Sequence, residues 1–291
     1  MEELVAYSLT AVVLTAASIT DLRTREVPDW LNYGAAISGV AIALLSSLIL
    51  GTIWPLVYSV TGLLVFLAIG SIMFYAGQWG GGDSKMLIAL GALLGLQFGL
   101  KFPFLSLDQV MIAFWINLML VGVLYAFVWS IIIAARNRQR FAKQFSQQAA
   151  QLKGFRLTIT ALLAVIIIPI LVVQEPLIRM ALIAAVLATA MAVFLWLFAK
   201  AVEKSCMLKY VEPEKLTEGD WIAKDVYVDG KYVCGPKDLG IEKSQIRKLM
   251  KYRQLGKIKK VLIKEGIPFV PSFLIAFLVS VEFGNVLLML L

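Results

Sequence analysis

Two aspartates stand out because each lies where a long apolar stretch meets a polar one. Asp21 follows the apolar run 3–20, and Asp83 follows three glycines and precedes the apolar run 84–100. A carboxylate beside hydrocarbon is costly and is by default a functional hypothesis. Two carboxylates that converge around a water cannot both ionise easily, so one can keep its proton while the other acts as a general base. The pair therefore predicts the chemistry of an aspartic protease.

The composition excludes most other chemistries. The chain has 291 residues, is 60% hydrophobic and 16% charged, and contains no histidine. Such a composition excludes an ordinary soluble globular domain, and the missing histidine excludes catalytic arrangements that depend on an imidazole. Two cysteines, Cys206 and Cys234, are too few for a zinc site of paired CxxC motifs or for a disulfide framework. We therefore expect a carboxylate chemistry that needs no metal and no cofactor.

Apolar runs of the length that crosses a bilayer dominate the chain. A membrane-spanning helix needs about 20 mostly apolar residues. Eight runs approach that length, and they predict an all-α polytopic membrane protein. They cover residues 3–20, 31–50, 55–76, 84–100, 108–134, 157–174, 177–199 and 268–290.

One stretch, residues 203–266, contains more than half of the charged residues of the chain. Within it, alternating apolar residues around Asp229-Gly230 predict a hairpin with a type I′ turn over 226–233. A helix over 242–253 and a strand over 258–263 complete a small α+β domain. The predicted domains are a transmembrane part with the aspartates, this polar domain, and a last transmembrane helix, covering residues 1–202, 203–266 and 267–291.

The distribution of Lys and Arg predicts the orientation in the membrane, because cytoplasmic loops carry the excess of basic residues. If both termini lie outside, almost all basic residues fall on the inner side, together with the polar domain and both aspartates. The net charge of +8 then reflects the inner face and membrane lipids and does not indicate nucleic-acid binding. The basic amphipathic segment 135–156 is expected along the inner membrane surface, held by anionic headgroups.

Each aspartate also has a simpler interpretation. Asp83 could cap the helix that it begins, and Asp21 could be a solvated loop residue. The glycine run Gly80, Gly81 and Gly82 argues for more, because three glycines are costly in chain entropy unless the backbone takes positive φ or is approached closely. We expect that an extended peptide packs against this backbone.

The residues around both aspartates resemble the type IV prepilin and preflagellin peptidases. The segment DLRTREVPDWL that begins at Asp21 resembles their first-aspartate motif, and GGGDSKML around Asp83 resembles their GxGD motif. The segment 267–274 resembles the start of the last helix of the family, and the polar domain resembles the cytosolic insertion of its archaeal branch. The resemblance implies a membrane-embedded aspartyl peptidase of the plasma membrane, with Asp21 and Asp83 as the catalytic pair.

The resemblance also implies the substrates, which are pilin-like or archaellin precursors cut at the cytosolic face behind a short basic leader. Such a leader would be drawn to acids beside the site, and Glu26 and Asp29 are placed for that. Asp29 could equally be the N-cap of the second helix. Lys85 could hold a neighbouring carboxylate or a phosphate headgroup, and we expect a structural or electrostatic role for it.

Two other functions remain open from the residues alone. Paired intramembrane acids beside broken helices also serve ion-coupled transporters, but both acids here lie at one face and no inverted repeat is visible. A presenilin-like intramembrane protease shares the GxGD motif, yet its two aspartates lie in adjacent spans. Here the two aspartates are not in adjacent spans, because the predicted spans 31–50 and 55–76 lie between Asp21 and Asp83.

Overall fold

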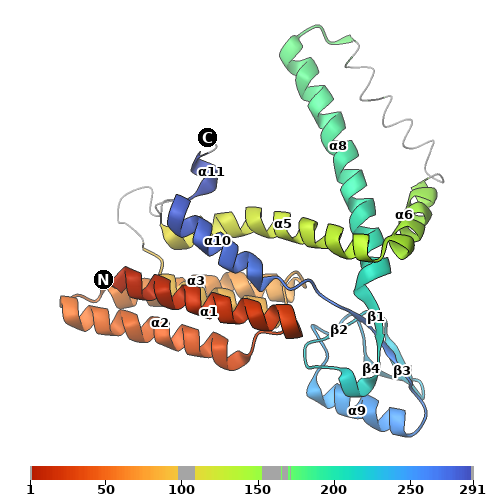
Figure 1. Ribbon diagram of the computed structural model, residues 1–291, viewed down its shortest axis with the longest axis horizontal. Helices are drawn as coiled ribbons and strands as arrows, with labels where there is room; N and C mark the ends of the chain where they lie inside the picture. The colour runs from red at the N-terminus through yellow and green to blue at the C-terminus, as the bar shows by residue number, and fades with distance from the viewer. Residues whose placement is uncertain (1, 98–108, 153–164, 166–169, 171, 290–291) are drawn as a thin grey trace.

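The computed structural model describes residues 2–97, 109–152, 165, 170 and 172–289 (Figure 1). In this described part, five helices are long and apolar enough to cross a membrane. Each combines about 20 or more residues with few charges, which is what a span of the hydrocarbon core requires. These helices are α1 (Glu2–Thr24), α2 (Asp29–Leu50), α3 (Trp54–Tyr75), α5 (Val110–Arg136) and α8 (Pro176–Val202).

Two of the eight predicted spans are shorter helices. Helix α4 covers Gly81–Leu94 and ends at Gly95, and α10 covers Val270–Phe283 and ends at Gly284. Both terminal glycines have a φ of 66°, in the left-handed region that ends helices. The short helix α11 (Val286–Met289) follows. The predicted span 157–174 lies largely outside the described residues, so a count of eight spans is not confirmed.

Helices α1 to α5 and α10 pack together around one hydrophobic core (Figure 1). Helix α4 packs between α2 and α3, and α10 packs between α1 and α5. Glycines allow the close approach of α4: the Cβ position of Gly91 is 2.5 Å from the carbonyl oxygen of Gly62, and that of Gly39 is 2.7 Å from the backbone of Ala92. Small residues serve this purpose in membrane helices, whose backbones then meet directly.

Helices α6 (Arg138–Leu152) and α8 form an arm that leaves this bundle at a steep angle to α5 (Figure 1). The rings of Phe141 and Phe198 are 5.5 Å apart, and those of Phe145 and Phe194 are 6.1 Å apart. The aromatic face of α6 is therefore occupied by α8. The expected position of segment 135–156 on the inner membrane surface stays a prediction.

The polar stretch folds into two small sheets and a helix. Strands β1 (Leu208–Val211), β5 (Val261–Lys264) and β2 (Trp221–Ile222) form an antiparallel sheet in the order β1-β5-β2. Strands β3 (Val226–Val228) and β4 (Lys231–Cys234) form a separate hairpin. Helix α9 (Lys243–Gln254) begins with a reciprocal capping box of Glu242 and Gln245. Its Leu249 lies in a hydrophobic core shared with both sheets.

The predicted hairpin is confirmed at its turn. Asp229 and Gly230 have φ values of 52° and 75°, as a type I′ turn requires. Val228 pairs with Lys231, and Tyr227 pairs with Tyr232. The predicted helix over 242–253 and strand over 258–263 are also found, as α9 and β5 with shifted ends. The division of the chain into three domains stays a prediction.

Candidate active site

Asp21 lies in the last turn of α1 and is buried, with 5% of its surface exposed. The backbone N–H of Val270 donates a hydrogen bond to its Oδ2 over 2.9 Å. Val270 is the first residue of α10, whose free N–H groups and positive dipole end stabilise an anion. The first aspartate is thus held by the N-terminus of a helix 249 residues further along the chain.

Asp83 lies in the first turn of α4, is half-buried, and is close enough to Asp21 for the two carboxylates to interact electrostatically. Its Oδ2 lies 3.4 Å from the Cβ position of Gly80. Gly80 is the N-cap residue of α4, and the helix has no side-chain cap hydrogen bond there. The structure therefore brings the two aspartates to the same end of the bundle.

The glycine run beside Asp83 differs from expectation. Gly80, Gly81 and Gly82 are not among the residues with positive φ. Their Cβ positions lie between 3.4 and 3.7 Å from the nearest atoms, which is ordinary van der Waals contact. Neither positive φ nor a forced approach within the chain explains the run. Gly82 faces Val27, so the run packs against the loop that follows Asp21.

The three charged residues proposed around the site have different surroundings. Lys85 Nζ forms an ion pair with Asp29 Oδ1 at 2.5 Å and lies 5.6 Å from the centre of the Tyr33 ring. Pro28, not Asp29, is the N-cap residue of α2, and it has no side-chain cap bond. Glu26 is exposed and follows Arg25 in the loop between α1 and α2.

Glu26 faces the polar domain. Burial raises the pKa of Asp220 above its usual range, and the charges of Glu26 and Glu265 raise it further. The next residue, Trp221, lies 3.5 Å from the Cβ position of Gly77, in the loop before α4. The loops next to both aspartates thus contact the same part of the polar domain. This part is acidic, because Asp220 lies near Glu26 and Glu265.

Arg25 is a functional candidate that the sequence analysis did not single out. It has a φ of 61°, rare for a residue other than glycine. Its guanidinium donates a hydrogen bond to the carbonyl oxygen of Gly266 and lies 5.9 Å from the centre of the Trp129 ring. Arg25 thereby fixes the end of α1 to the segment that leads into α10 and to α5. The feature of the sequence that could have identified Arg25 is its position four residues after Asp21, within the first-aspartate motif.

An aromatic cluster packs next to the residues of the site. The sequence analysis did not predict it. Trp79 is buried, and its ring lies 5.9, 5.8 and 5.5 Å from the rings of Trp115, Phe269 and Phe273. Trp79 immediately precedes the glycine run, and Phe269 immediately precedes Val270. The cluster therefore joins the two segments that approach the aspartates.

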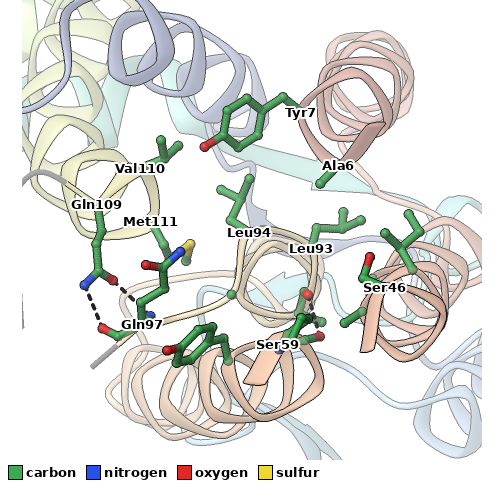
Figure 2. Close-up of a pocket in the computed structure, with 17 residues that line it drawn as sticks. Ala6, Tyr7, Ser46, Ser59, Leu93, Leu94, Gln97, Gln109, Val110 and Met111 are labelled. Atoms are coloured by element: carbon green, nitrogen blue, oxygen red, sulfur yellow. Dashed lines mark hydrogen bonds between the residues drawn. The ribbon is translucent and has the colours of Figure 1, made fainter. Parts of the chain in front are cut away.

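A pocket of about 540 Å³ lies at the other end of the bundle (Figure 2). It is lined by residues such as Tyr7 and Met111, and no carboxylate is among its lining residues. At its edge, the Gln109 side chain bonds the backbone N–H and carbonyl oxygen of Gln97 over 3.0 and 2.7 Å. Because it lies far along α1 and α4 from the aspartates, the pocket is separate from this site.

Comparisons with known proteins cover the part of the chain that holds both aspartates. Residues 8–136 match the model described as the type IV leader peptidase family. A preflagellin peptidase of Methanococcus maripaludis (strain C6 / ATCC BAA-1332) is 40% identical over 91 residues, which are 31% of this chain and 39% of that protein. A preflagellin peptidase of Methanococcus voltae is 33% identical over 91 residues, with the same coverage of both chains.

A third similar protein, a preflagellin peptidase of Methanocaldococcus jannaschii, is 36% identical over 84 residues, which are 29% of this chain and 36% of that protein. The chain thus spans less than two fifths of the length of these curated relatives. The family model and the three relatives agree with the resemblance to prepilin and preflagellin peptidases that the segments around Asp21 and Asp83 indicate. The comparisons therefore confirm that resemblance: residues 8–136 of this chain are similar to the type IV leader peptidase family.

Proposed function

We propose that this protein is a membrane-embedded aspartyl endopeptidase. It removes the short basic leader from archaellin or pilin-like precursors at the cytosolic face of the plasma membrane. The observation that carries the proposal is the meeting of Asp21 and Asp83 at one end of the helical bundle. The relatives described as preflagellin peptidases support an archaellin precursor as the substrate.

The proposed mechanism uses the two carboxylates with one shared proton. The N–H of Val270 stabilises a negative charge on Asp21, so we assign Asp21 as the carboxylate that takes a proton from the attacking water. Protonated Asp83 then donates its proton to the oxygen of the scissile carbonyl. The tetrahedral intermediate collapses when Asp21 gives the proton that it took from water to the peptide nitrogen, which leaves as an amine. Asp83 regains its proton from a hydroxyl of the intermediate, so both carboxyls return to their starting states. Two carboxylates near enough to interact electrostatically suit this exchange, because neighbouring like charges cannot both ionise easily.

The proposed location of the site at the cytosolic face follows from the distribution of Lys and Arg residues. The 15 Lys and Arg residues of 203–266 favour a cytosolic polar domain under the positive-inside rule. Because this domain lies beside the loops next to Asp21 and Asp83, the aspartates belong to the same face. The acidic side of that region, with Glu26 and Asp220, suits a leader rich in Lys and Arg.

Replacing either aspartate by asparagine tests the proposal. Asp21→Asn and Asp83→Asn keep the shape of the side chain but replace the ionisable carboxyl group by an amide, which can act neither as the base nor as the acid. Each variant should lose about 10³-fold or more of the cleavage rate, measured by the mobility shift of a purified archaellin precursor in detergent. A pilin-like precursor in the same assay compares the two substrate classes.

The matched control is Asp229→Asn, at the tip of the β3–β4 hairpin, where asparagine suits the positive φ of 52°. This variant should cleave at the wild-type rate. Wild-type-like cleavage by Asp21→Asn or Asp83→Asn, in folded protein, would exclude the two-carboxylate mechanism.

A further inference from the structure

Tyr125, in the middle of α5, has a buried hydroxyl with no hydrogen-bond partner among the described residues. Its ring stacks on Trp129, one turn further along α5, with ring centres 5.9 Å apart and planes 26° apart. A tyrosine that is buried usually places its hydroxyl against a partner. A hydroxyl that has left water without gaining one is costly, so its position requires an explanation.

The contacts of α5 place this hydroxyl beside the catalytic aspartates. One turn before Tyr125, the Cβ position of Gly122 is 2.8 Å from the ring of Phe269, the residue before the one that binds Asp21. One turn after it, Trp129 lies under the guanidinium of Arg25.

Asp21, in the last turn of α1, lies four residues before Arg25 in the loop that follows, just as Tyr125 lies four residues before Trp129 on α5. The N–H of Arg25 still bonds the Asp21 carbonyl oxygen over 2.9 Å, so the rise between these two residues is about that of one turn. Because α1 and α5 run in the same direction (Figure 1), the Arg25–Trp129 contact places Asp21 and Tyr125 at similar levels. The charges of both Asp21 and Arg25 act on the Tyr125 hydroxyl, which agrees with this placement.

We propose that Tyr125 is a further catalytic residue, whose hydroxyl donates a hydrogen bond to the oxygen of the scissile carbonyl as negative charge develops there. The inference rests on the proposed peptidase function. The hydroxyl keeps its proton throughout, so the proton exchange between water, Asp21 and Asp83 is unchanged. A precursor peptide bound between the aspartates supplies the acceptor that the hydroxyl lacks in the free protein.

A donor held in advance at the site of developing charge is worth most in the transition state, because no reorganisation is needed when the reaction occurs. The stack on Trp129 fixes the Tyr125 ring, and the Arg25 guanidinium above Trp129 fixes that tryptophan. The hydroxyl is therefore preorganised by two side chains, Trp129 of α5 and Arg25 of the loop that follows α1. Its effect should fall on the chemical step rather than on the binding of the precursor.

The variant Tyr125→Phe removes the hydroxyl and keeps the stacked ring. We expect kcat for the archaellin precursor to fall about 10²-fold, the loss that removal of one such donor typically causes, while KM changes less than about twofold. Tyr210→Phe, which removes an exposed hydroxyl from β1 of the polar domain, is the matched control and should retain wild-type kcat. An unchanged kcat in Tyr125→Phe, or a loss confined to KM, would overturn the proposal.

Two further measurements separate direct contact with the substrate from a merely structural role. A statine-containing peptide that spans the junction of leader and hydrophobic segment mimics the tetrahedral intermediate, and Tyr125→Phe should bind it about tenfold less tightly. The uncleaved precursor should bind Asp83→Asn with equal affinity whether or not Tyr125→Phe is added. If the acid limb of the pH profile of kcat/KM shifts in Tyr125→Phe, the hydroxyl acts through Asp21, and direct contact is contradicted.

The controls also distinguish this inference from the proposed function. If the wild-type protein cleaves no precursor, the proposed function fails first. If the wild type cleaves, both aspartate variants are inactive and Tyr125→Phe cleaves at the wild-type rate, only the role of Tyr125 is disproved.

Discussion

At the scale of residues, the attraction of a basic leader to the site depends on which acidic side chains already form ion pairs within the protein. Asp29 is paired with Lys85, so its charge is partly neutralised before any leader arrives. Glu26 is exposed, and no ion pair is found for it among the described residues. Of the two acids predicted to attract a basic leader, Glu26 is therefore the better placed.

Neutralising Glu26 tests this assignment. Glu26→Gln should raise KM for a precursor with a basic leader about three- to tenfold and leave kcat nearly unchanged, because the charge acts on binding rather than on the reacting bond. The increase should shrink at high salt, since exposed charges are screened. Steady-state cleavage at two salt concentrations measures both effects.

A precursor whose leader lysines and arginines are replaced by glutamine is the control for Glu26→Gln. With that substrate, the variant and the wild type should have the same KM. An equal increase in KM for both precursors would show that Glu26 supports the structure of the loop instead of attracting the leader.

At the scale of elements, the position of Asp83 depends on how closely α4 approaches its neighbours. Helix α4 is only 14 residues long, and its backbone meets α3 at Gly62 and Gly91. The Cβ position of Gly91 lies 3.0 Å from Cβ of Phe66 as well as 2.5 Å from the Gly62 oxygen. A side chain at this crossing would separate the two helices and move the start of α4.

The variant Gly91→Ala should therefore destabilise the bundle by about 1–3 kcal/mol, the usual cost of overpacking, and lower the cleavage rate. Gly34→Ala in α2 is the control, because no atom lies within 4 Å of its Cβ position; alanine there should be neutral or stabilising by up to about 1 kcal/mol. Thermal unfolding in detergent compares the two. Equal Tm values would contradict the close-packing argument.

At the scale of the whole molecule, charge distribution and shape bear on orientation in the membrane. The helical bundle is apolar, whereas the polar domain lies beside one end of it, the end that holds Asp21 (Figure 1). Helix α8 is almost entirely exposed and steeply inclined to α5. The predicted orientation, with outer termini and an inner polar domain, can be tested without knowledge of the substrate.

Cysteine labelling in intact cells with a membrane-impermeant maleimide provides that test. In a Cys206→Ser background, Ile53→Cys, between α2 and α3, should be labelled from outside, whereas Lys248→Cys in α9 should be labelled only after permeabilisation. Cys234 should stay unlabelled, because it is buried and burial raises the pKa of its thiol to about 11. The reverse labelling pattern would place the aspartates at the outer face.

The sequence by itself determined the features that depend on local pattern and on the cost of burying charge. Long apolar runs predicted the helices α1, α2, α3, α5 and α8, and Asp229-Gly230 predicted the hairpin turn. Because carboxylates are costly in hydrocarbon, their scarcity outside 203–266 was enough to select Asp21 and Asp83. The lengths of α4 and α10 were overestimated, because apolar composition does not reveal that Gly95 and Gly284 end their helices.

Only the tertiary structure decided which partners these residues meet. Val270 binds Asp21 across 249 positions of sequence, and Lys85 pairs with Asp29 across 56. Tyr125 lies in a run of apolar residues whose pattern is that of any membrane helix, so nothing local distinguished its hydroxyl. The physical reason is that spacing along the chain specifies the faces of an element, whereas the contacts between faces depend on how all the helices pack together.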